Sequence, residues 1–305
     1  MVNDDAVQAL RDQHYNATIT HFERVHDELW ILRVKPDDEV SEHKAGQYAN
    51  LALGYWEPRI DDAREADLDA KWEKLVRRSY SIACRMIDDD GNLVGSPHEG
   101  ELELYIVLVA PDGDFVPGLT PRLALKGVGD RIFVGRKLAG RYTLDPVTDP
   151  QSTVILLSTG TGEAPHNVME VELLRRGHQG TIVSVVCVRH ANDLAYLDAH
   201  RRLEERYDNY HYVPLLTREP GVEKRYIQDL ITDGDLAKVL GGELDPASTH
   251  VFLCGNPSMI GLPTYTDDDT PEYPETTGVV ELLSERGFTL DRRKQPGNIH
   301  YEEFW

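Results

Sequence analysis

The chain has 305 residues, 40% of them hydrophobic, which is enough to form the cores of two domains of ordinary size. Lys and Arg number 32 against 53 Asp and Glu, and the resulting net charge of −21 disfavours nucleic acid and anionic lipid as partners. No apolar run reaches the roughly 18 residues of a membrane span, and the acidic start of the chain does not resemble a secretory signal.

The three cysteines, Cys84, Cys187 and Cys254, are far apart and form no CxxC motif. This spacing argues against a disulfide framework, an iron–sulfur cluster or a zinc site, so no metal is expected. We therefore predict a cytoplasmic protein that contacts neither nucleic acid nor membrane, and we interpret its acidity as a solubility adaptation.

The first half of the chain is a series of short segments typical of β-strands. The clearest is 101–109, where Leu102, Leu104, Ile106 and Leu108 recur with period two. Further strands are predicted within 16–33, 47–53, 78–86, 131–134 and 141–144. Several short strands broken by Gly and Pro predict an antiparallel β-barrel.

In the second half, strands alternate with helices. Strands are predicted at 153–158, 181–188, 210–217 and 250–254, and helices at 165–176, 193–207 and 226–232. This alternation predicts an α/β domain with a doubly wound parallel sheet. We place the domains at 1–148 and 149–305.

Two segments are interpreted as insertions. Near 57–76, Leu68, Trp72, Leu75 and Val76 have helical spacing and predict an extra helix on the barrel rim. Residues 262–277 are rich in Pro, Thr and Asp without periodicity and predict a surface loop.

The first of four short motifs is Arg78-Ser79-Tyr80-Ser81. On a strand, Arg78 and Tyr80 share one face and Ser81 lies on the other. A guanidinium clamps a phosphate, an aromatic ring stacks on a flat heterocycle, and a hydroxyl hydrogen-bonds a ring nitrogen. The alternative is an ordinary strand with one Arg and one Tyr.

The second motif is Gly118-Leu119-Thr120-Pro121-Arg122, which predicts a helix capped by Thr120 with Pro121 at its first position. The free N–H groups of a helix N-terminus bind phosphate. The alternative is a plain capped helix.

The third motif, Ser158-Thr159-Gly160-Thr161-Gly162-Glu163-Ala164-Pro165, follows a predicted strand and opens a helix, as a nucleotide-phosphate loop does. It lacks the lysine of an ATP- or GTP-binding loop. The fourth, Cys254-Gly255-Asn256-Pro257, ends the last of these strands, at the sheet edge where ligands bind. Cys254 alone would be interpreted as a small core residue.

In this order, the four motifs, Gly129-Asp130 and an aromatic carboxyl terminus resemble the ferredoxin–NADP reductases, in particular the bacterial branch also called flavodoxin reductases. The resemblance runs from about Thr18 to Trp305 apart from the two insertions. It implies a FAD-binding antiparallel β-barrel followed by an NADP-binding α/β domain with a five-stranded parallel sheet. It also implies a monomeric reductase that transfers hydride between NADP(H) and FAD and exchanges single electrons with ferredoxin and/or flavodoxin.

The resemblance also assigns roles to single residues. Ser81 would lie near flavin N5, Cys254 near the nicotinamide, and Glu303, or alternatively Glu302, would relay a proton. The FAD-binding residues would be Arg78, Tyr80, Ser81, Gly118, Leu119, Thr120, Thr143, Phe304 and Trp305, with the last two covering the isoalloxazine and the adenine. The NADP-binding residues would be Gly160, Thr161, Gly162, Ala164, Pro165, Arg189, Arg218, Arg225, Tyr226, Cys254, Gly255, Asn256 and Pro257.

The choice of NADP over NAD depends on arginines. Arg189 and Arg218 each follow a predicted strand, and Arg225 lies just beyond beside Tyr226. Cations at strand ends suit the 2′-phosphate of NADP, whereas NAD sites carry an acidic residue there. The alternative is a solvated basic surface.

Two other functions stay open. One is a reductase component that serves an oxygenase or a cytochrome, and the other is a non-catalytic flavin-binding sensor, which would not need Arg189, Arg218 and Cys254. An acidic carrier protein would also require a local basic patch, for which the candidates are Arg122, Arg136, Lys137 and the run Arg292-Arg293-Lys294.

Overall fold

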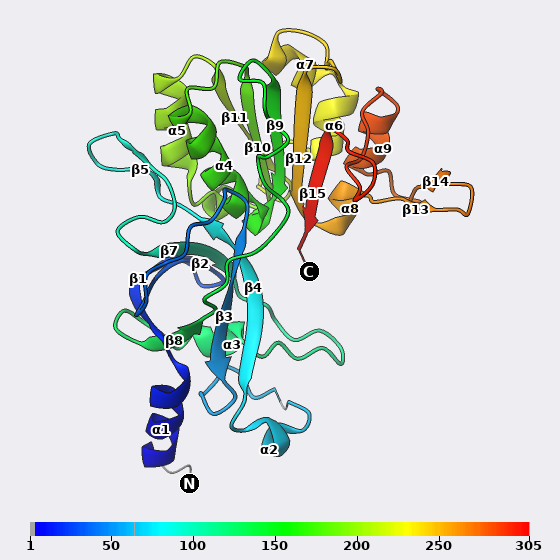
Figure 1. The fold of residues 1–305 in the computed structure, drawn as a ribbon. Coiled ribbons are helices and arrows are strands. Elements are labelled where there is room, and N and C mark those ends of the chain that lie inside the picture. Colours follow the sequence, from blue (N-terminus) through cyan, green and yellow to red (C-terminus); the bar gives the residue numbers. More distant parts are fainter. Residues whose placement is uncertain (1–3, 64, 305) are drawn as a thin grey trace. The chain divides into compact units, whose positions relative to one another are not determined.

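The computed structural model describes residues 4–63 and 65–304, and the chain divides into two compact units (Figure 1). Unit 1 comprises Met1–Cys84 and Gly95–Arg141, and unit 2 comprises Arg85–Val94 and Tyr142–Trp305. Unit 2 therefore contains a segment from the first half of the sequence, in addition to the C-terminal half. No helix in the described part of the chain is long and apolar enough to cross a membrane.

Unit 1 is a closed antiparallel barrel of six strands in the order β1-β2-β7-β4-β3-β8, so the predicted barrel is confirmed. Its apolar interior includes Trp30, Leu51 and Leu104, each at most 1% exposed. The helix α1 precedes the barrel. The elements are α1 (Asp4–His14), β1 (Ala17–His26), β2 (Leu29–Pro36), β3 (Tyr48–Gly54), α2 (Leu68–Lys71), β4 (Leu75–Ala83), β7 (Leu102–Val107), α3 (Thr120–Leu123) and β8 (Arg131–Val134).

Two sequence predictions in this half need correction. Among the described residues of the segment near 57–76, only Leu68–Lys71 is helical, whereas Leu75 and Val76 belong to β4, because Val76 packs into the barrel core. The segment 141–144 forms no strand, although Tyr142 and Leu144 are buried. In both cases some of the apolar side chains that suggested an element, namely Val76, Tyr142 and Leu144, are buried by tertiary packing in a different conformation.

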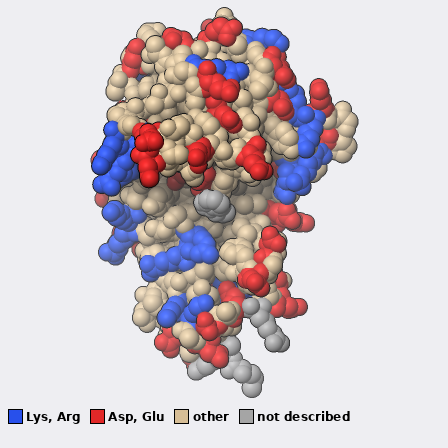
Figure 2. Space-filling model, turned by 90° about the vertical axis from the view of Figure 1, so that its right-hand side faces the viewer, with Lys and Arg blue, Asp and Glu red and all other residues tan. Residues whose placement is uncertain are grey.

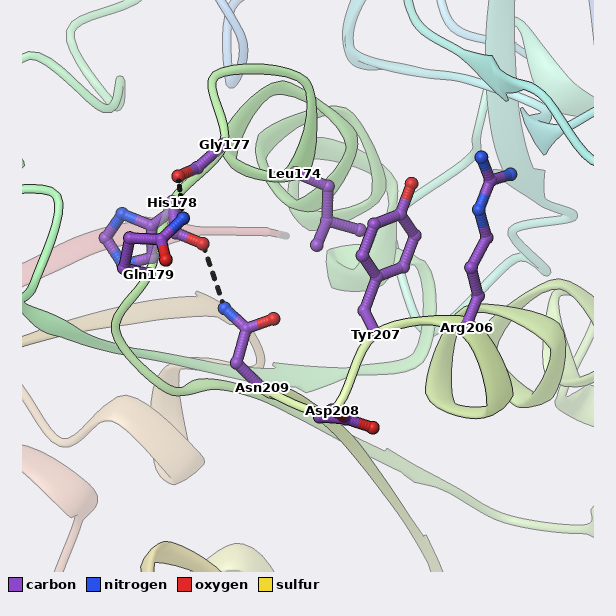
Figure 3. A pocket seen from close by; sticks show the side chains of 8 residues that line it. All are labelled: Leu174, Gly177, His178, Gln179, Arg206, Tyr207, Asp208 and Asn209. Carbon is purple, nitrogen blue, oxygen red and sulfur yellow. Dashed lines mark hydrogen bonds between the residues drawn. The ribbon is translucent and has the colours of Figure 1, made fainter.

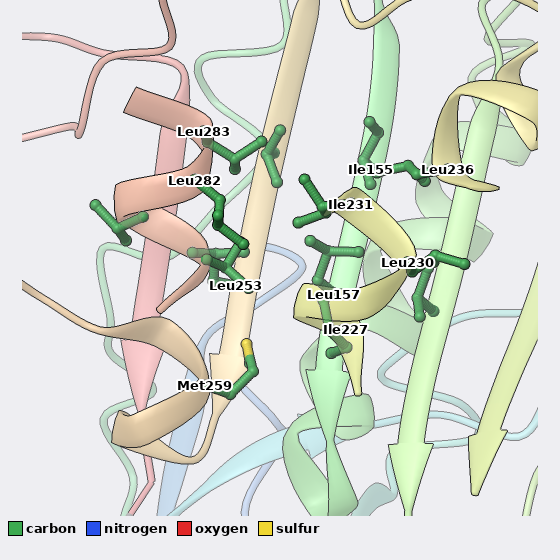
Figure 4. Packing of buried hydrophobic residues seen from close by; sticks show 14 of the residues in the cluster. Ile155, Leu157, Ile227, Leu230, Ile231, Leu236, Leu253, Met259, Leu282 and Leu283 are labelled. Carbon is green, nitrogen blue, oxygen red and sulfur yellow. The ribbon is translucent and has the colours of Figure 1, made fainter. Parts of the chain in front are cut away.

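Unit 2 is built around a five-stranded parallel sheet in the order β11-β10-β9-β12-β15, as predicted. Helices α6, α7, α8 and α9 bury Leu, Ile and Met side chains against one face of the sheet, and α4 and α5 pack against the other (Figures 1 and 4). The elements are β9 (Thr153–Thr159), η1 (Gly160–Gly162), α4 (Glu163–Arg175), β10 (Ile182–Val188), η2 (Ala191–Asp193), α5 (Leu197–Arg206), β11 (Tyr210–Leu216), α6 (Ile227–Thr232), α7 (Asp235–Leu240), β12 (Thr249–Gly255), α8 (Pro257–Ile260), α9 (Val279–Ser284) and β15 (Ile299–Glu303).

The C-terminal segment is part of this sheet. Strand β15 pairs with β12 along the register Val251↔Ile299 to Gly255↔Glu303. The aromatic carboxyl terminus expected from the sequence thus follows an ordered strand that ends at Glu303.

Unit 2 also contains two short β-hairpins outside the parallel sheet. The first, residues 85–94, contains β5 (Met86–Ile87) and β6 (Leu93–Val94) and lies against α4 and α5. Arg202 donates a hydrogen bond to the Asp88 carbonyl at 2.9 Å, and Arg206 donates one to the Gly91 carbonyl.

The second hairpin lies in the inserted segment 262–277 and contains β13 (Thr264–Tyr265) and β14 (Pro271–Glu272). Arg292 binds Asp269 through two hydrogen bonds of 2.8 and 3.0 Å and lies 3.9 Å above the ring of Tyr265. The insertion is therefore fastened to the loop that precedes β15.

Candidate active site

The barrel part of the candidate site is strand β4. Arg78 is exposed, Tyr80 is partly buried against the barrel core, and Ser81 is buried. Burial raises the pKa of the Tyr80 phenol, and the charge of Arg78 opposes this rise. The only hydrogen bond recorded for the Arg78 guanidinium among described residues goes to the Arg77 carbonyl, at 2.8 Å. A cation without a carboxylate partner and a partly exposed ring suit a flat ligand with a phosphate.

The turn at Gly118–Thr120 differs from its prediction. Leu119, not Thr120, precedes the helix α3, and Thr120 is its first residue. The Thr120 hydroxyl accepts a hydrogen bond from Val109 N at 3.1 Å and makes no cap. A side chain at position 118 would meet Val76 at 2.7 Å, so glycine is required there by packing.

Arg122 is buried, with 2% of its side chain exposed, so it cannot belong to a basic docking patch. It binds both oxygens of Glu65, at 2.9 and 2.5 Å, and donates to the carbonyls of Gly118 and Tyr55. This arginine therefore holds the segment around Glu65 against α3. The sequence-based assignment was wrong because the partner carboxylate lies 57 residues away along the chain.

The other cations proposed for a patch are exposed to different degrees. Arg136 pairs with Asp38 at 2.7 Å with both side chains mostly exposed, and Arg292 is engaged by Asp269. Arg293 and Lys294 are exposed. Figure 2 shows one face on which groups of Lys and Arg side chains alternate with acidic ones. Local basic areas therefore exist in spite of the net charge of −21.

The α/β part of the candidate site lies at the carboxyl ends of β9 and β12. Gly160–Gly162 form a short 3-10 turn that leads directly into α4. Gly160 has a φ of 53°, and nothing lies within 4 Å of the position its Cβ would take. The first turn of a helix offers unpaired N–H groups and the positive end of the helix dipole, which suits a pyrophosphate.

This loop is locked to the loop after β12. A Cβ on Gly162 would lie 2.3 Å from the Cys254 carbonyl oxygen, and one on Gly255 would lie 2.2 Å from Thr159 Oγ1. The Thr159 hydroxyl accepts a hydrogen bond from Asn256 N at 2.7 Å. The structure thus brings together the third and fourth sequence motifs, and they are joined by the hydroxyl of Thr159, a residue of the third motif for which no role was predicted.

The fourth motif continues into α8. Asn256 caps this helix by accepting a hydrogen bond from Ser258 N at 2.8 Å, and Pro257 occupies its first position. Phe304 is partly buried, and its N–H donates to the Gly255 carbonyl at 2.9 Å. The chain after β15 is therefore tied to this loop as far as Phe304, while Trp305 lies outside the described residues.

Cys254 is fully buried beside two other titratable groups. Its register partner in β15 is Glu302, whereas Glu303 lies opposite Gly255. Burial raises the pKa of the Cys254 thiol, with a contribution from Glu302, and raises the pKa of Glu302 to about 7. The pKa of Tyr142 is also raised by burial and by these two groups. The register therefore places Glu302, and not Glu303, next to Cys254.

The arginines predicted to bind the 2′-phosphate of NADP follow β10 and β11. Arg218 N donates to the Arg189 carbonyl at 2.8 Å, which joins the ends of the two strands. The Arg189 side chain is 44% exposed, 3.6 Å from Asp193, and Arg218 is exposed. Tyr226 is 43% exposed.

Arg225 is less available than Arg189 and Arg218. It pairs with Asp233 at 3.1 Å and with Asp235 at 2.7 Å, and these partners raise its pKa. Lys224, which the sequence analysis did not single out, lies 4.7 Å above the ring of Tyr226. A cation on this aromatic ring would add to the positive charge around the strand ends.

Thr143 is buried, and its hydroxyl accepts a hydrogen bond from Asp145 N at 3.5 Å. It belongs to unit 2, so its predicted contact with FAD stays a prediction. The described residues contain no group of three or more His, Cys, Asp or Glu side chains arranged to hold a metal ion.

A pocket of about 370 Å³ lies elsewhere in unit 2. It is lined by residues that follow α4 and precede β11, among them Gly177, His178 and Tyr207 (Figure 3). These positions are at the amino ends of the strands, whereas the glycine loops are at the carboxyl ends. The pocket is therefore separate from the candidate site.

Comparison with known proteins identifies the family of the chain. Residues 156–262 match the family model described as Oxidoreductase NAD-binding domain. The flavodoxin/ferredoxin–NADP reductase of Shigella flexneri is 33% identical over 223 residues, which cover 71% of this chain and 75% of that protein. The chain belongs to the flavodoxin/ferredoxin–NADP reductase family.

Two further comparisons agree with this family. The ferredoxin–NADP reductase of Pseudomonas aeruginosa is 32% identical over 224 residues, which cover 69% of this chain and 84% of that protein. The crystal structure of a ferredoxin NADP+ reductase from Neisseria gonorrhoeae with bound FAD and NADP has the same fold, with a TM-score of 0.70 and 21% identity over 95% of this chain and 98% of that one. The barrel and the sheet thus correspond to the two domains of a flavodoxin/ferredoxin–NADP reductase.

Proposed function

We propose that this flavodoxin/ferredoxin–NADP reductase binds FAD on strand β4 and NADP(H) on the carboxyl edge of the parallel sheet. It is an FAD-dependent oxidoreductase that couples hydride transfer with NADP(H) to one-electron transfer with ferredoxin or flavodoxin. The observation that carries the assignment of the NADP site is the interlocked pair of loops at Gly160–Gly162 and Cys254–Asn256, next to two exposed arginines at adjoining strand ends.

The residues of β4 fit FAD. Arg78 would hold the pyrophosphate, because its guanidinium binds only a backbone carbonyl among described residues. Tyr80 would stack on the isoalloxazine, and Ser81 would hydrogen-bond near N5. FAD, when bound, supplies the group that accepts hydride and passes on single electrons.

Unit 2 would bind and orient NADP(H). The N–H groups at the start of α4 would bind its pyrophosphate, and Arg189 and Arg218 would bind its 2′-phosphate. Tyr226 would stack on the adenine. The buried Cys254 thiol would stay neutral at physiological pH, because burial raises its pKa.

Glu302 is the group we propose to hold a proton in the site. Burial raises its pKa to about 7, so it is half protonated near neutral pH. It is the register partner of Cys254, whereas Glu303 is less affected by burial. This assignment replaces Glu303 by its neighbour as the proposed proton relay.

The test combines spectroscopy with substitution of the two arginines. Purified protein should be yellow and show the visible absorbance of oxidised flavin, and NADPH should bleach it without oxygen. In the variant R189A/R218A, the KM for NADPH should rise by about 100-fold, since two charge-assisted phosphate contacts are lost. The KM for NADH should change by less than about threefold.

The controls separate this function from its rivals. A colourless protein that does not take up FAD would contradict the assignment, and flavin that NADPH fails to bleach would indicate a sensor. Rates with ferredoxin, flavodoxin and cytochrome c as acceptors identify the carrier. We further propose that the protein acts as a monomer and that it acts in the cytoplasm, a reducing compartment that suits its three buried, unbridged cysteines.

A further inference from the structure

A fully buried cluster of charged and polar side chains lies directly behind the proposed pyrophosphate loop. It contains Glu163 and Glu170 from α4, His200 from α5, and Tyr210 from β11, none more than 1% exposed. His200 Nε2 is 2.7 Å from Glu163 Oε1, and His200 Nδ1 is 2.6 Å from the Tyr210 hydroxyl. The His200 ring also stacks on Tyr212, with 4.0 Å between the ring centroids.

The hydrogen bonds determine where the protons lie. With Glu170 ionised, the Tyr210 hydroxyl donates its single hydrogen to that carboxylate at 2.6 Å and therefore accepts one from His200 Nδ1. A proton must also lie between His200 Nε2 and Glu163 Oε1, because two lone pairs would repel at 2.7 Å. Glu163 and His200 together therefore carry no net charge, whichever of them holds that proton.

The charge of Glu163 matters because this residue lies at the start of α4, where the pyrophosphate is proposed to bind. Glu163 is the first residue of α4 and follows Gly162 without a gap. Its carboxylate lies within about one helical turn of an anion bound by the first N–H groups of the helix. An uncompensated carboxylate there would repel that anion, and the interior of a protein screens this repulsion weakly.

We infer that His200 is a positioning residue that cancels the charge of Glu163 and so keeps the N-terminus of α4 able to bind the pyrophosphate of NADP(H). The inference rests on the proposed function. The other oxygen of Glu163, Oε2, is buried and accepts no hydrogen bond from a described residue, so His200 Nε2 is the donor that the carboxylate has. Glu170 accepts a hydrogen bond from Tyr210 and lies 3.5 Å from His200 Nδ1, and burial raises its pKa.

The experiment is a double-mutant cycle read by the binding of NADP+ to the FAD-loaded protein, with isothermal titration calorimetry at low ionic strength. In H200Q, the amide still donates a hydrogen bond but carries no charge, and the Kd should rise by about tenfold or more. In E163Q, the Kd should stay within about threefold of wild type, and in E163Q/H200Q it should return to that range. FAD content and the thermal transition of each variant establish that it folds.

Rescue in the double variant is the result that a purely structural role would not produce, because a second lesion in the same buried cluster would weaken binding further. A Kd for H200Q within about twofold of wild type, or a double variant as weak as H200Q, would overturn the inference and leave the proposed function standing. Wild-type protein that does not bind NADP+ would overturn both.

Discussion

The contact between Gly162 and the carbonyl of Cys254 is the most demanding steric constraint in the candidate NADP site. In G162A, the new Cβ would lie 2.3 Å from the Cys254 oxygen and 2.7 Å from its carbonyl carbon. Gly162 has a φ of −60°, which alanine adopts freely, so the whole effect would come from this clash. The atoms in the way are backbone and cannot rotate aside, so one of the two loops must move.

Forcing an extra methyl group into a packed site costs about 1–3 kcal/mol. For a domain of this size, that corresponds to a fall in Tm of about 2–12 °C, at 2–4 °C per kcal/mol. The displaced loop also carries Cys254 and receives the N–H of Phe304, so NADPH oxidation should lose kcat as well as affinity. Differential scanning calorimetry and steady-state kinetics measure the two effects.

Gly160 provides the matched control. In G160A the new Cβ would meet no atom within 4 Å, but the φ of 53° is unfavourable for alanine. The cost should be about 1–2 kcal/mol from the backbone alone, without displacement of Cys254. If G162A melts at the wild-type temperature and oxidises NADPH at the wild-type rate, the two loops are not packed as described.

Three further predictions concern charged groups. Burial would raise the pKa of Glu57, but hydrogen bonds from Arg11 and Lys126 lower it to about 2. The contribution of Glu57 to stability should therefore be complete above pH 4.5 and disappear as the pH falls through about 2. Acid titration of E57Q should lack this step, and the free energy of unfolding of E57Q at pH 7 should be about 3 kcal/mol below that of wild type. Burial raises the pKa of Glu302 to about 7, so the destabilising effect of the ionised carboxylate should grow as the pH rises from 4.5 through 7. In chemical denaturation at pH 8, E302Q should be more stable than wild type by up to about 3 kcal/mol, and NADPH oxidation by E302Q should lose a pH-dependent step near 7. In R293E/K294E, the KM for an acidic carrier should rise severalfold at low salt while ferricyanide reduction is unchanged. A KM equal to that of wild type would show that these two residues are not part of the docking surface. R292E is unsuitable for this test because Arg292 pairs with Asp269.

The periodic features of the sequence were sufficient to predict the fold. Period-two segments predicted the barrel, and alternating strands and helices predicted the parallel sheet, because burial of one face imposes these repeats. The motifs at Gly160–Pro165 and Cys254–Pro257 were also placed at the correct strand ends. These patterns are local, so they can be recognised in the sequence without knowledge of tertiary contacts.

The predictions that failed concern residues whose partners are distant in sequence. Thr120 does not cap its helix because its hydroxyl serves Val109, and Arg122 is buried because Glu65 neutralises it. The register of β15 on β12 places Glu302 opposite Cys254, and a shift of one residue would place Glu303 there instead; the proton-relay role assigned to Glu303 stays a prediction. Contacts between residues that are distant in sequence leave no periodic pattern, so the sequence alone does not predict them.

The hairpin at residues 85–94 determines how this protein can be divided. It buries Met86, Ile87 and Val94, and Arg202 and Arg206 of α5 hold its backbone. A fragment that begins at Tyr142 would lose this cover and expose apolar surface of α4 and α5 to water, where it promotes aggregation. A soluble NADP-binding fragment would therefore require residues 85–94 to be supplied as well, for example by circular permutation.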